Sequence, residues 1–258
     1  MRLVAAAVFL LQTAEGAPRH ARPDLRPGLD TLYAGDFAIA AQAFADLAAR
    51  DTADPAPLIF QAGAYIWWAA AKDSDDFAAA GIDSLLDRAI AQAKARAPGI
   101  ERDFWLATAL GYRARERELH GHAWGAAKDA KAMRDAYRRV LAVDSSCSDC
   151  FLGLGLYSYG LARASTIAKL VARIIGLGGG NTQEGLTMMR RVAREGDLAR
   201  VEGTWVLAAA LVREADRDDR RRSELRTEAV ALVEALAVRY PANPVFQRFL
   251  HEVAHAPP

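Results

Sequence analysis

The one complete catalytic motif in the sequence lies at its carboxyl end, where His251, Glu252 and His255 form the pattern H-E-x-x-H. Two histidines spaced by four residues share one face of a helix and can bind zinc, while the glutamate can act as general base. A catalytic zinc needs a third protein ligand, and only residues 256–258 follow the motif. Ligands on a terminal helix also lack rigid support. We therefore interpret the motif as a chance match, keep His251 and His255 as metal candidates only, and expect no cofactor.

The two cysteines of the chain, Cys147 and Cys150, form the pattern C-x-x-C. Covalent haem attachment requires a histidine at the next position, which is Phe151. Redox sites with this pattern usually lie between a strand and a helix, and we predict no strand here. In an exported protein, a local disulfide at the start of a helix is the favoured interpretation. Two unpaired thiols come second and redox catalysis third.

A glycine-rich run at residues 176–180 has the composition of a phosphate-binding loop. It lacks the preceding strand, and the lysine with serine or threonine, that a P-loop requires. We interpret it as a helix end followed by a turn. His120 and His122 flank Gly121, which predicts a turn between two helices rather than a metal site. None of these motifs supports catalysis, and we expect the protein not to be an enzyme.

Helices must position these residues, because composition and hydrophobic pattern favour helix throughout the chain. Hydrophobic residues make up 52% of the sequence and charged residues 25%, as in globular proteins. Alanine is abundant, and no segment alternates apolar and polar residues for long enough to predict a strand. We predict helices over residues 28–34, 37–50, 56–72, 77–97, 101–119, 123–142, 148–175, 182–195, 198–214, 220–239 and 243–254. The expected fold class is all-α.

The amino-terminal residues have the pattern of a signal peptide, in which a basic residue precedes a short apolar run and then small residues. We predict a signal peptide over residues 1–16, a proline-containing linker over 17–27 and a helical domain over 28–258. This pattern predicts a periplasmic or secreted protein.

Charge and hydropathy argue against a nucleic-acid partner and against a membrane-spanning segment. The 33 basic residues are balanced by 32 acidic ones, so there is no basic excess of the kind that binds nucleic acid. No uncharged apolar run reaches the ~18 residues that suggest a membrane span. The segment 161–177 combines one apolar stripe with basic side chains only. Such a helix can pack in the core or contact an anionic membrane surface peripherally, and we prefer the core.

Several short motifs resemble those of tetratricopeptide-repeat (TPR) proteins. They comprise a turn glycine, a small residue, a groove-filling aromatic, two Leu-Gly pairs and a Tyr-Pro terminator: Gly35, Ala40, Phe44, Leu110-Gly111, Leu152-Gly153 and Tyr240-Pro241. The resemblance implies a right-handed superhelix of stacked antiparallel helical hairpins. Similar helix tails recur at Leu47, Leu141 and Leu236, but much farther apart than the ~34 residues of a standard unit. The repeats are therefore irregular.

The segment from Phe151 through Gly180 to Tyr240 also resembles a broad group that includes eukaryotic inclusion-body-clearance proteins. In that group, too, a long helix precedes a glycine-containing turn. We take this resemblance as an indication of the fold only, because shared helical repeats do not determine function.

The TPR resemblance also implies a binding groove lined by the first helix of each unit. Carried over to the two Leu-Gly pairs, the family pattern directs five side chains towards that groove: Thr108, Tyr112, Arg115, Leu154 and Tyr157. Such grooves bind extended peptides or partner helices. The leading hypothesis is a non-enzymatic adaptor or scaffold of the cell envelope or secreted space that binds a protein or peptide partner.

Two alternatives come from other functional classes. A periplasmic ligand-binding accessory of a transporter would enclose a large apolar cavity, with tryptophans around it. We expect Trp67, Trp68, Trp105 and Trp124 to pack in the core instead, because helical stacks need large filling side chains. A zinc metallohydrolase is the remote alternative and rests on the carboxyl-terminal motif alone.

Overall fold

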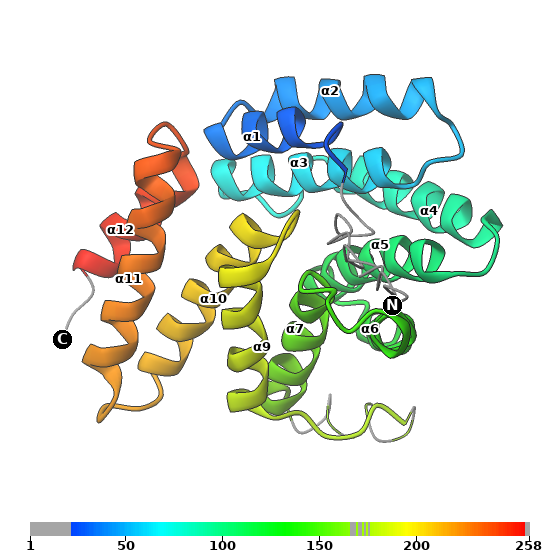
Figure 1. Cartoon of the computed structure of the whole chain (residues 1–258). Coiled ribbons are helices and arrows are strands. Elements are labelled where there is room, and N and C mark those ends of the chain that lie inside the picture. The colour runs from blue at the N-terminus through cyan, green and yellow to red at the C-terminus, as the bar shows by residue number, and fades with distance from the viewer. Residues whose placement is uncertain (1–21, 166–168, 170–171, 173, 175, 256–258) are drawn as a thin grey trace, which may run out of the picture.

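A computed structural model describes residues 22–165, 169, 172, 174 and 176–255 of the chain. Within these residues the secondary structure is entirely helical, without a strand, which confirms the predicted all-α class. Figure 1 shows the helices. They are α1 (Arg26–Ala34), α2 (Phe37–Arg50), α3 (Ala56–Lys72), α4 (Ala79–Ala95), α5 (Ile100–Leu119), α6 (Ala123–Val143), α7 (Cys150–Arg163), α9 (Thr182–Glu195), α10 (Arg200–Ala215), α11 (Arg222–Arg239) and α12 (Pro244–His255).

The helices are stacked in chain order. Each packs mainly against its neighbours in the sequence, so α1 contacts α2, α2 contacts α3, and so on through α11 and α12. In Figure 1 the stack curves from α1–α3 at the top, through α4–α6 on the right, to α7 and α9 below and then α10–α12 on the left. This arrangement is an all-α helical repeat. The right-handed sense of the superhelix and its kinship with TPR proteins stay predictions.

Local sequence signals end and begin these helices. Gly35 follows α1 with a left-handed φ of 99°. Its N–H donates to the carbonyl of Leu32, and the N–H of Asp36 donates to that of Thr31, so both carbonyl groups at the end of α1 are capped. A side chain at Gly35 would meet backbone atoms of residues 242 and 243, so only glycine fits there. At the start of α9, the side chain of Asn181 accepts a hydrogen bond from the N–H of Glu184 at 2.9 Å, an ordinary N-cap.

Aromatic residues join the two ends of the stack. Trp67 on α3 lies 5.6 Å from Tyr33 on α1, 5.9 Å from Trp205 on α10 and 5.7 Å from Phe246 on α12, measured between ring centroids. Contacts between α12 and α3 follow from this cluster. Because these large rings fill the space between the first and last helices, the inner side of the curve is packed core rather than open channel there.

The predicted helix over 148–175 is wrong. Helix α7 ends at Arg163, and Ala164 adopts an extended conformation. The break lets the chain fold back, because Gly180 lies against α7: a Cβ there would be 2.3 Å from the carbonyl oxygen of Ser158. The apolar pattern continues across the break, so it does not reveal it. Seven of the 17 residues of the amphipathic segment 161–177 lie outside the described residues, so its predicted membrane or core contact stays a prediction.

The amino-terminal boundary also differs from the prediction. Helix α1 begins at Arg26, and Leu25 before it is completely buried. Arg22 forms an ion pair of 2.7 Å with Asp54, the residue before Pro55 at the start of α3. Residues 22–27 of the predicted linker over 17–27 therefore belong to the folded domain, which includes residues before the predicted start at 28. The predicted signal peptide lies outside the described residues. Among the described helices, none is long and apolar enough to cross a membrane.

Candidate functional site

The predicted groove residues of α5 face other helices. The hydroxyl group of Thr108 lies 3.0 Å from that of Tyr137 on α6. The hydroxyl group of Tyr112 donates a hydrogen bond to the carboxylate of Glu202 on α10. Arg115 is half-exposed and pairs with the neighbouring carboxylate of Glu116. Helix α10 thus occupies the position in front of Tyr112 where a peptide was expected.

The predicted groove residues of α7 are also engaged within the fold. Leu154 is buried in the core. The hydroxyl group of Tyr157 donates to the backbone carbonyl of Leu177 and accepts from Arg134 at 2.7 Å. Arg134 donates to the same carbonyl at 2.8 Å. Tyr157 and Arg134 therefore fix the glycine-rich run onto α6 and α7. Of the five predicted groove residues, Arg115 is exposed, Leu154 is buried, and Thr108, Tyr112 and Tyr157 are half-buried with their hydroxyl groups engaged inside the fold.

Tyr112 and Glu202 form a half-buried polar contact between two helices. Desolvation raises the pKa of the Glu202 carboxyl group, against the opposing effects of the Tyr112 hydrogen bond and the charge of Arg115. Desolvation also raises the pKa of the Tyr112 phenol, and the nearby Glu202 charge adds to the increase. Each group is the hydrogen-bond partner of the other. The pair therefore joins α5 to α10, at a sequence separation that no local motif could indicate.

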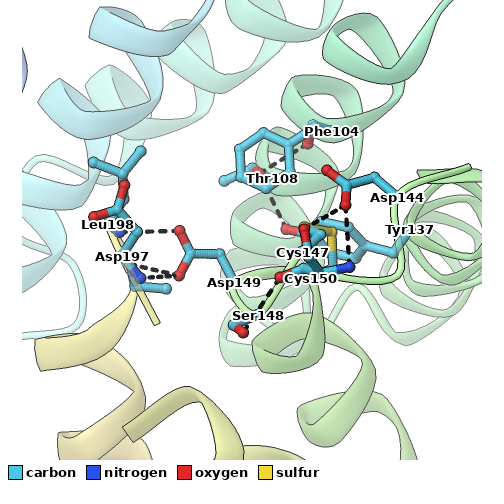
Figure 2. The surroundings of a disulfide bond; sticks show 12 residues. Phe104, Thr108, Tyr137, Asp144, Cys147, Ser148, Asp149, Cys150, Asp197 and Leu198 are labelled. Carbon is cyan, nitrogen blue, oxygen red and sulfur yellow. Dashed lines mark hydrogen bonds between the residues drawn. A yellow bond between two sulfur atoms is a disulfide. The ribbon is translucent and has the colours of Figure 1, made fainter. Parts of the chain in front are cut away.

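The cysteine pair lies at the start of α7. In the structure the sulfur atoms of Cys147 and Cys150 are bonded, and both residues are buried. Figure 2 shows the disulfide with the side chain of Asp149 pointing away from it, towards the turn between α9 and α10. The Asp149 carboxylate accepts backbone hydrogen bonds from Asp197 at 2.7 Å and Leu198 at 2.9 Å.

Asp149 thus caps the turn that precedes α10, a helix that begins about 50 residues later in the chain. A third and longer contact, at 3.4 Å, joins it to the N–H of Ala199, the residue before α10. Burial raises the pKa of Asp149, and the three backbone N–H groups oppose that increase. No sequence motif predicts this capping role for Asp149. The two cysteines of the disulfide lie on either side of Asp149 in the sequence. The bond between them constrains the backbone that carries the capping carboxylate.

The candidate metal ligands do not come together as a metal site among the residues that the structure describes. His251 is exposed on α12, and the side chain of His255 lies outside the described residues. Across the described part of the chain, no group of three histidine, cysteine, aspartate or glutamate residues is placed to hold a metal ion. His120 and His122 lie in the turn between α5 and α6, as predicted, and the Nδ1 atom of His120 is 2.9 Å from the carbonyl oxygen of Glu116.

Two surface hollows lie away from the tryptophans. One, of about 390 Å³, lies where α2 and α4 end, among charged residues such as Arg50 and Arg96. The other, of about 980 Å³, lies beside the glycine-rich run and the start of α9. No tryptophan lines either hollow.

Exposed and half-buried apolar side chains lie instead at the tips of two neighbouring hairpins. Trp124, which we expected in the core, is 48% exposed at the start of α6, and Leu119 at the end of α5 is 41% exposed. A helix start at a turn has no neighbouring helix beyond it, so the Trp124 ring contacts Lys128 on its own helix. The other predicted core tryptophans differ from it: Trp67 and Trp105 are buried, and Trp68 is half-buried.

The two tips lie close together, although no hydrogen bond among the described residues joins the Nε2 atom of His120 to the other tip. The Nε2 atom of His120 lies 3.8 Å from a carboxylate oxygen of Asp76, in the turn between α3 and α4. We call the surface formed by Trp68 and residues 73–78 on one hairpin, and by Leu119 and Trp124 on the next, the tip surface. It combines aromatic side chains with exposed carboxylates.

Comparison of the chain with protein-family models and with curated proteins finds no match in either case.

Proposed function

We propose that the protein is a non-enzymatic scaffold that binds a protein partner at the tip surface. The exposed Trp124 carries this proposal. Tryptophan is among the residues that contribute most to protein–protein binding, because its ring buries a large area at small entropic cost. Leu119 across the turn supplies further apolar area beside it.

The rest of the fold supports a tip surface rather than a groove. Tyr112, Leu154 and Tyr157 are held in internal contacts, and aromatic rings fill the space between the first and last helices. Helical-repeat proteins bind partners through surfaces that extend over neighbouring repeats. The tip surface extends over two hairpins, α3–α4 and α5–α6, so a partner that binds there would contact both.

The test is cross-linking in the cell with a photoreactive amino acid in place of the exposed Glu118, beside Leu119. We expect a cross-linked protein that disappears in the Trp124→Ala variant. The matched control is Val238→Ala, which removes an apolar side chain that is 83% exposed on α11. A cross-link that survives Trp124→Ala, or that both variants remove, would contradict the proposal.

We further propose that the protein acts in the periplasm or outside the cell. The signal-like pattern of residues 1–16 supports this compartment, and so does the Cys147–Cys150 disulfide, because oxidising compartments preserve such bonds. Cell fractionation and amino-terminal sequencing of the mature protein test it. We expect a mature chain that begins at Ala17, and a full-length chain in the cytosol would contradict export.

The two alternatives stay predictions. A transporter accessory would bind a small ligand, and a screen by thermal shift would detect it. A zinc metallohydrolase would retain zinc through purification and lose it in a His255→Ala variant, which elemental analysis measures.

A further inference from the structure

One part of the tip surface holds a cation against two aromatic rings. Trp68 near the end of α3 and Phe77 in the following turn have ring centroids 5.0 Å apart and tilted by 59°. The ammonium group of Lys72 lies 5.1 Å from the Phe77 centroid and 5.7 Å from the Trp68 centroid. Both distances are within the range of cation–π attraction. We call Trp68 and Phe77 the ring pair.

The ring pair is accessible. Both of its side chains are half-buried, so part of each ring faces solvent, and Lys72 itself is exposed. Tyr65, one turn earlier on α3, lies parallel to the Trp68 ring with its centroid 6.4 Å away. It supports the ring pair from behind, on the same helix.

Negative charge surrounds the ring pair. The turn that carries Phe77 contains three exposed carboxylates, Asp73, Asp75 and Asp76. They outnumber the two cations nearby, Lys72 and Arg248, whose guanidinium donates to a carbonyl group near the end of α3. The end of α3 lies beside them, and a helix carboxyl end has a partial negative charge. The turn has a defined shape, because the N–H groups of Asp73 and Ser74 bond to carbonyl groups of α3 and the N–H of Phe77 bonds to Ser74.

Aromatic faces within a negative field attract a cation and repel an anion. Lys72 shows that an alkylammonium group fits against these rings. It is held by these two rings, one on its own helix and one in the following turn, and makes no ion pair among the described contacts, so a second cation with better geometry can displace it into solvent.

We propose that the ring pair and its three aspartates bind a lysine or arginine side chain in a basic segment of the partner. Before the segment binds, the Lys72 ammonium group lies against the rings. When the segment binds, the ammonium group moves into solvent. This proposal rests on the scaffold function above and specifies the chemistry of its partner.

The test is isothermal titration calorimetry of the full mature chain with the peptide acetyl-Gly-Lys-Gly-Arg-Gly-Lys-Gly-amide. Its counterpart with glutamate at each charged position is the control peptide. We expect heat of binding with the cationic peptide only, weaker at about 0.15 M than at about 0.01 M ionic strength. Equal binding of both peptides, or none of the cationic one at low ionic strength, would overturn the proposal.

Substitution of Lys72 gives the sharpest result, because the expected change is a gain. Lys72→Met keeps most of the aliphatic stem but removes the ammonium group that competes for the rings, so the cationic peptide should bind about three- to tenfold more tightly. Lys94→Met removes the same charge from an exposed position on α4 and should leave affinity unchanged. In a Phe77→Leu background the gain from Lys72→Met should vanish. Unchanged affinity in Lys72→Met, or the same gain in both lysine variants, would refute the displacement.

The aspartates are tested with two triple variants of equal net charge. The Asp73→Asn, Asp75→Asn, Asp76→Asn triple variant should bind the cationic peptide at least about tenfold more weakly. The matched control changes three exposed carboxylates elsewhere, at Asp46, Asp219 and Glu234, to their amides. Equal losses in the two triple variants would mean that only net charge matters, which would overturn the site.

The two proposals can fail separately. If the peptide does not bind while the Trp124-dependent cross-link persists, the cation site is wrong and the scaffold function stands. If no such cross-link forms while the peptide binds with the expected variant pattern, the scaffold function is the part that fails.

Discussion

Replacement of Asp149 by alanine should destabilise the fold far more than loss of an ordinary turn residue. The buried carboxylate accepts two well-formed hydrogen bonds, from the N–H groups of Asp197 and Leu198. Hydrogen bonds to charged groups contribute about 1.5–3 kcal/mol each. Their combined loss is therefore about 3–6 kcal/mol, and release of the buried charge offsets part of it. We expect a net decrease of about 2–4 kcal/mol in the free energy of unfolding.

Urea denaturation followed by far-ultraviolet circular dichroism measures this change. The control is Asp51→Ala, because the Asp51 carboxylate accepts a comparable bond from the N–H of Ala53 at 3.0 Å but is exposed. Exposed substitutions usually cost about 0.5 kcal/mol or less. If Asp149→Ala costs no more than Asp51→Ala, the capping of the α9–α10 turn does not have the importance inferred from its geometry.

The pH dependence of the free energy of unfolding gives a second measurement of the contribution of Asp149. Burial raises the pKa of Asp149 in the folded state above its ordinary value of 3.8. The folded state therefore binds this proton more tightly than the unfolded state, so stability falls as pH rises from 3.8 through the raised pKa. Asp149→Asn removes that contribution. An identical pH slope in the variant and the parent chain, across that window, would show that Asp149 does not titrate as its burial requires.

Three further substitutions test other contacts by urea denaturation. Gly153→Ala should lower the free energy of unfolding by about 1–3 kcal/mol, because the new Cβ would lie 2.5 Å from an aromatic carbon of α6. The control is Gly160→Ala on the same helix, where a new Cβ meets nothing within 4 Å and should raise the free energy of unfolding by about 1 kcal/mol. Tyr112→Phe leaves its carboxylate partner on α10 without a donor and should cost about 1.5–3 kcal/mol; a change below that would mean water replaces the phenol. Joint replacement of Cys147 and Cys150 by alanine should cost about 2 kcal/mol or less, because the closed loop is short, and a larger loss would indicate that Asp149 is displaced as well.

Helix boundaries could be predicted where the stop signal is local. Helices α2, α3 and α9 have the predicted bounds of 37–50, 56–72 and 182–195. Each begins beside a residue whose conformation or side chain ends one element and starts the next: Gly35, Pro55 and Asn181. The end of α7 at Arg163 carries no such signal, because apolar residues continue in helical spacing beyond it. There the packing of Gly180 back onto α7 decides the boundary.

The candidate sites were predictable only as far as their contacts are local. The turn at His120 to His122 and the C-x-x-C pair could be interpreted from neighbouring residues. Asp149 could not, because its partners are backbone groups about 50 residues away and backbone groups leave no sequence pattern. Trp124 was misjudged for the opposite reason. Its residue type favours the core, but its position at the very start of α6 leaves it without a covering helix.

The predicted groove and the observed tip surface differ because of how the stack curves. The groove assignment assumed that the inner ends of first helices stay open, as in a long regular array. In this chain Tyr112 on α5 reaches Glu202 on α10, and Trp67 on α3 reaches Trp205 on the same helix. Residues this far apart in sequence meet only if the stack turns tightly enough for early and late helices to pack together. Such packing covers the inner side of these helices, whereas the turns that join α3 to α4 and α5 to α6 remain at an edge. A partner that binds there leaves the internal contacts intact, so Trp124→Ala should abolish binding while the midpoint of unfolding stays within the range of ordinary surface substitutions.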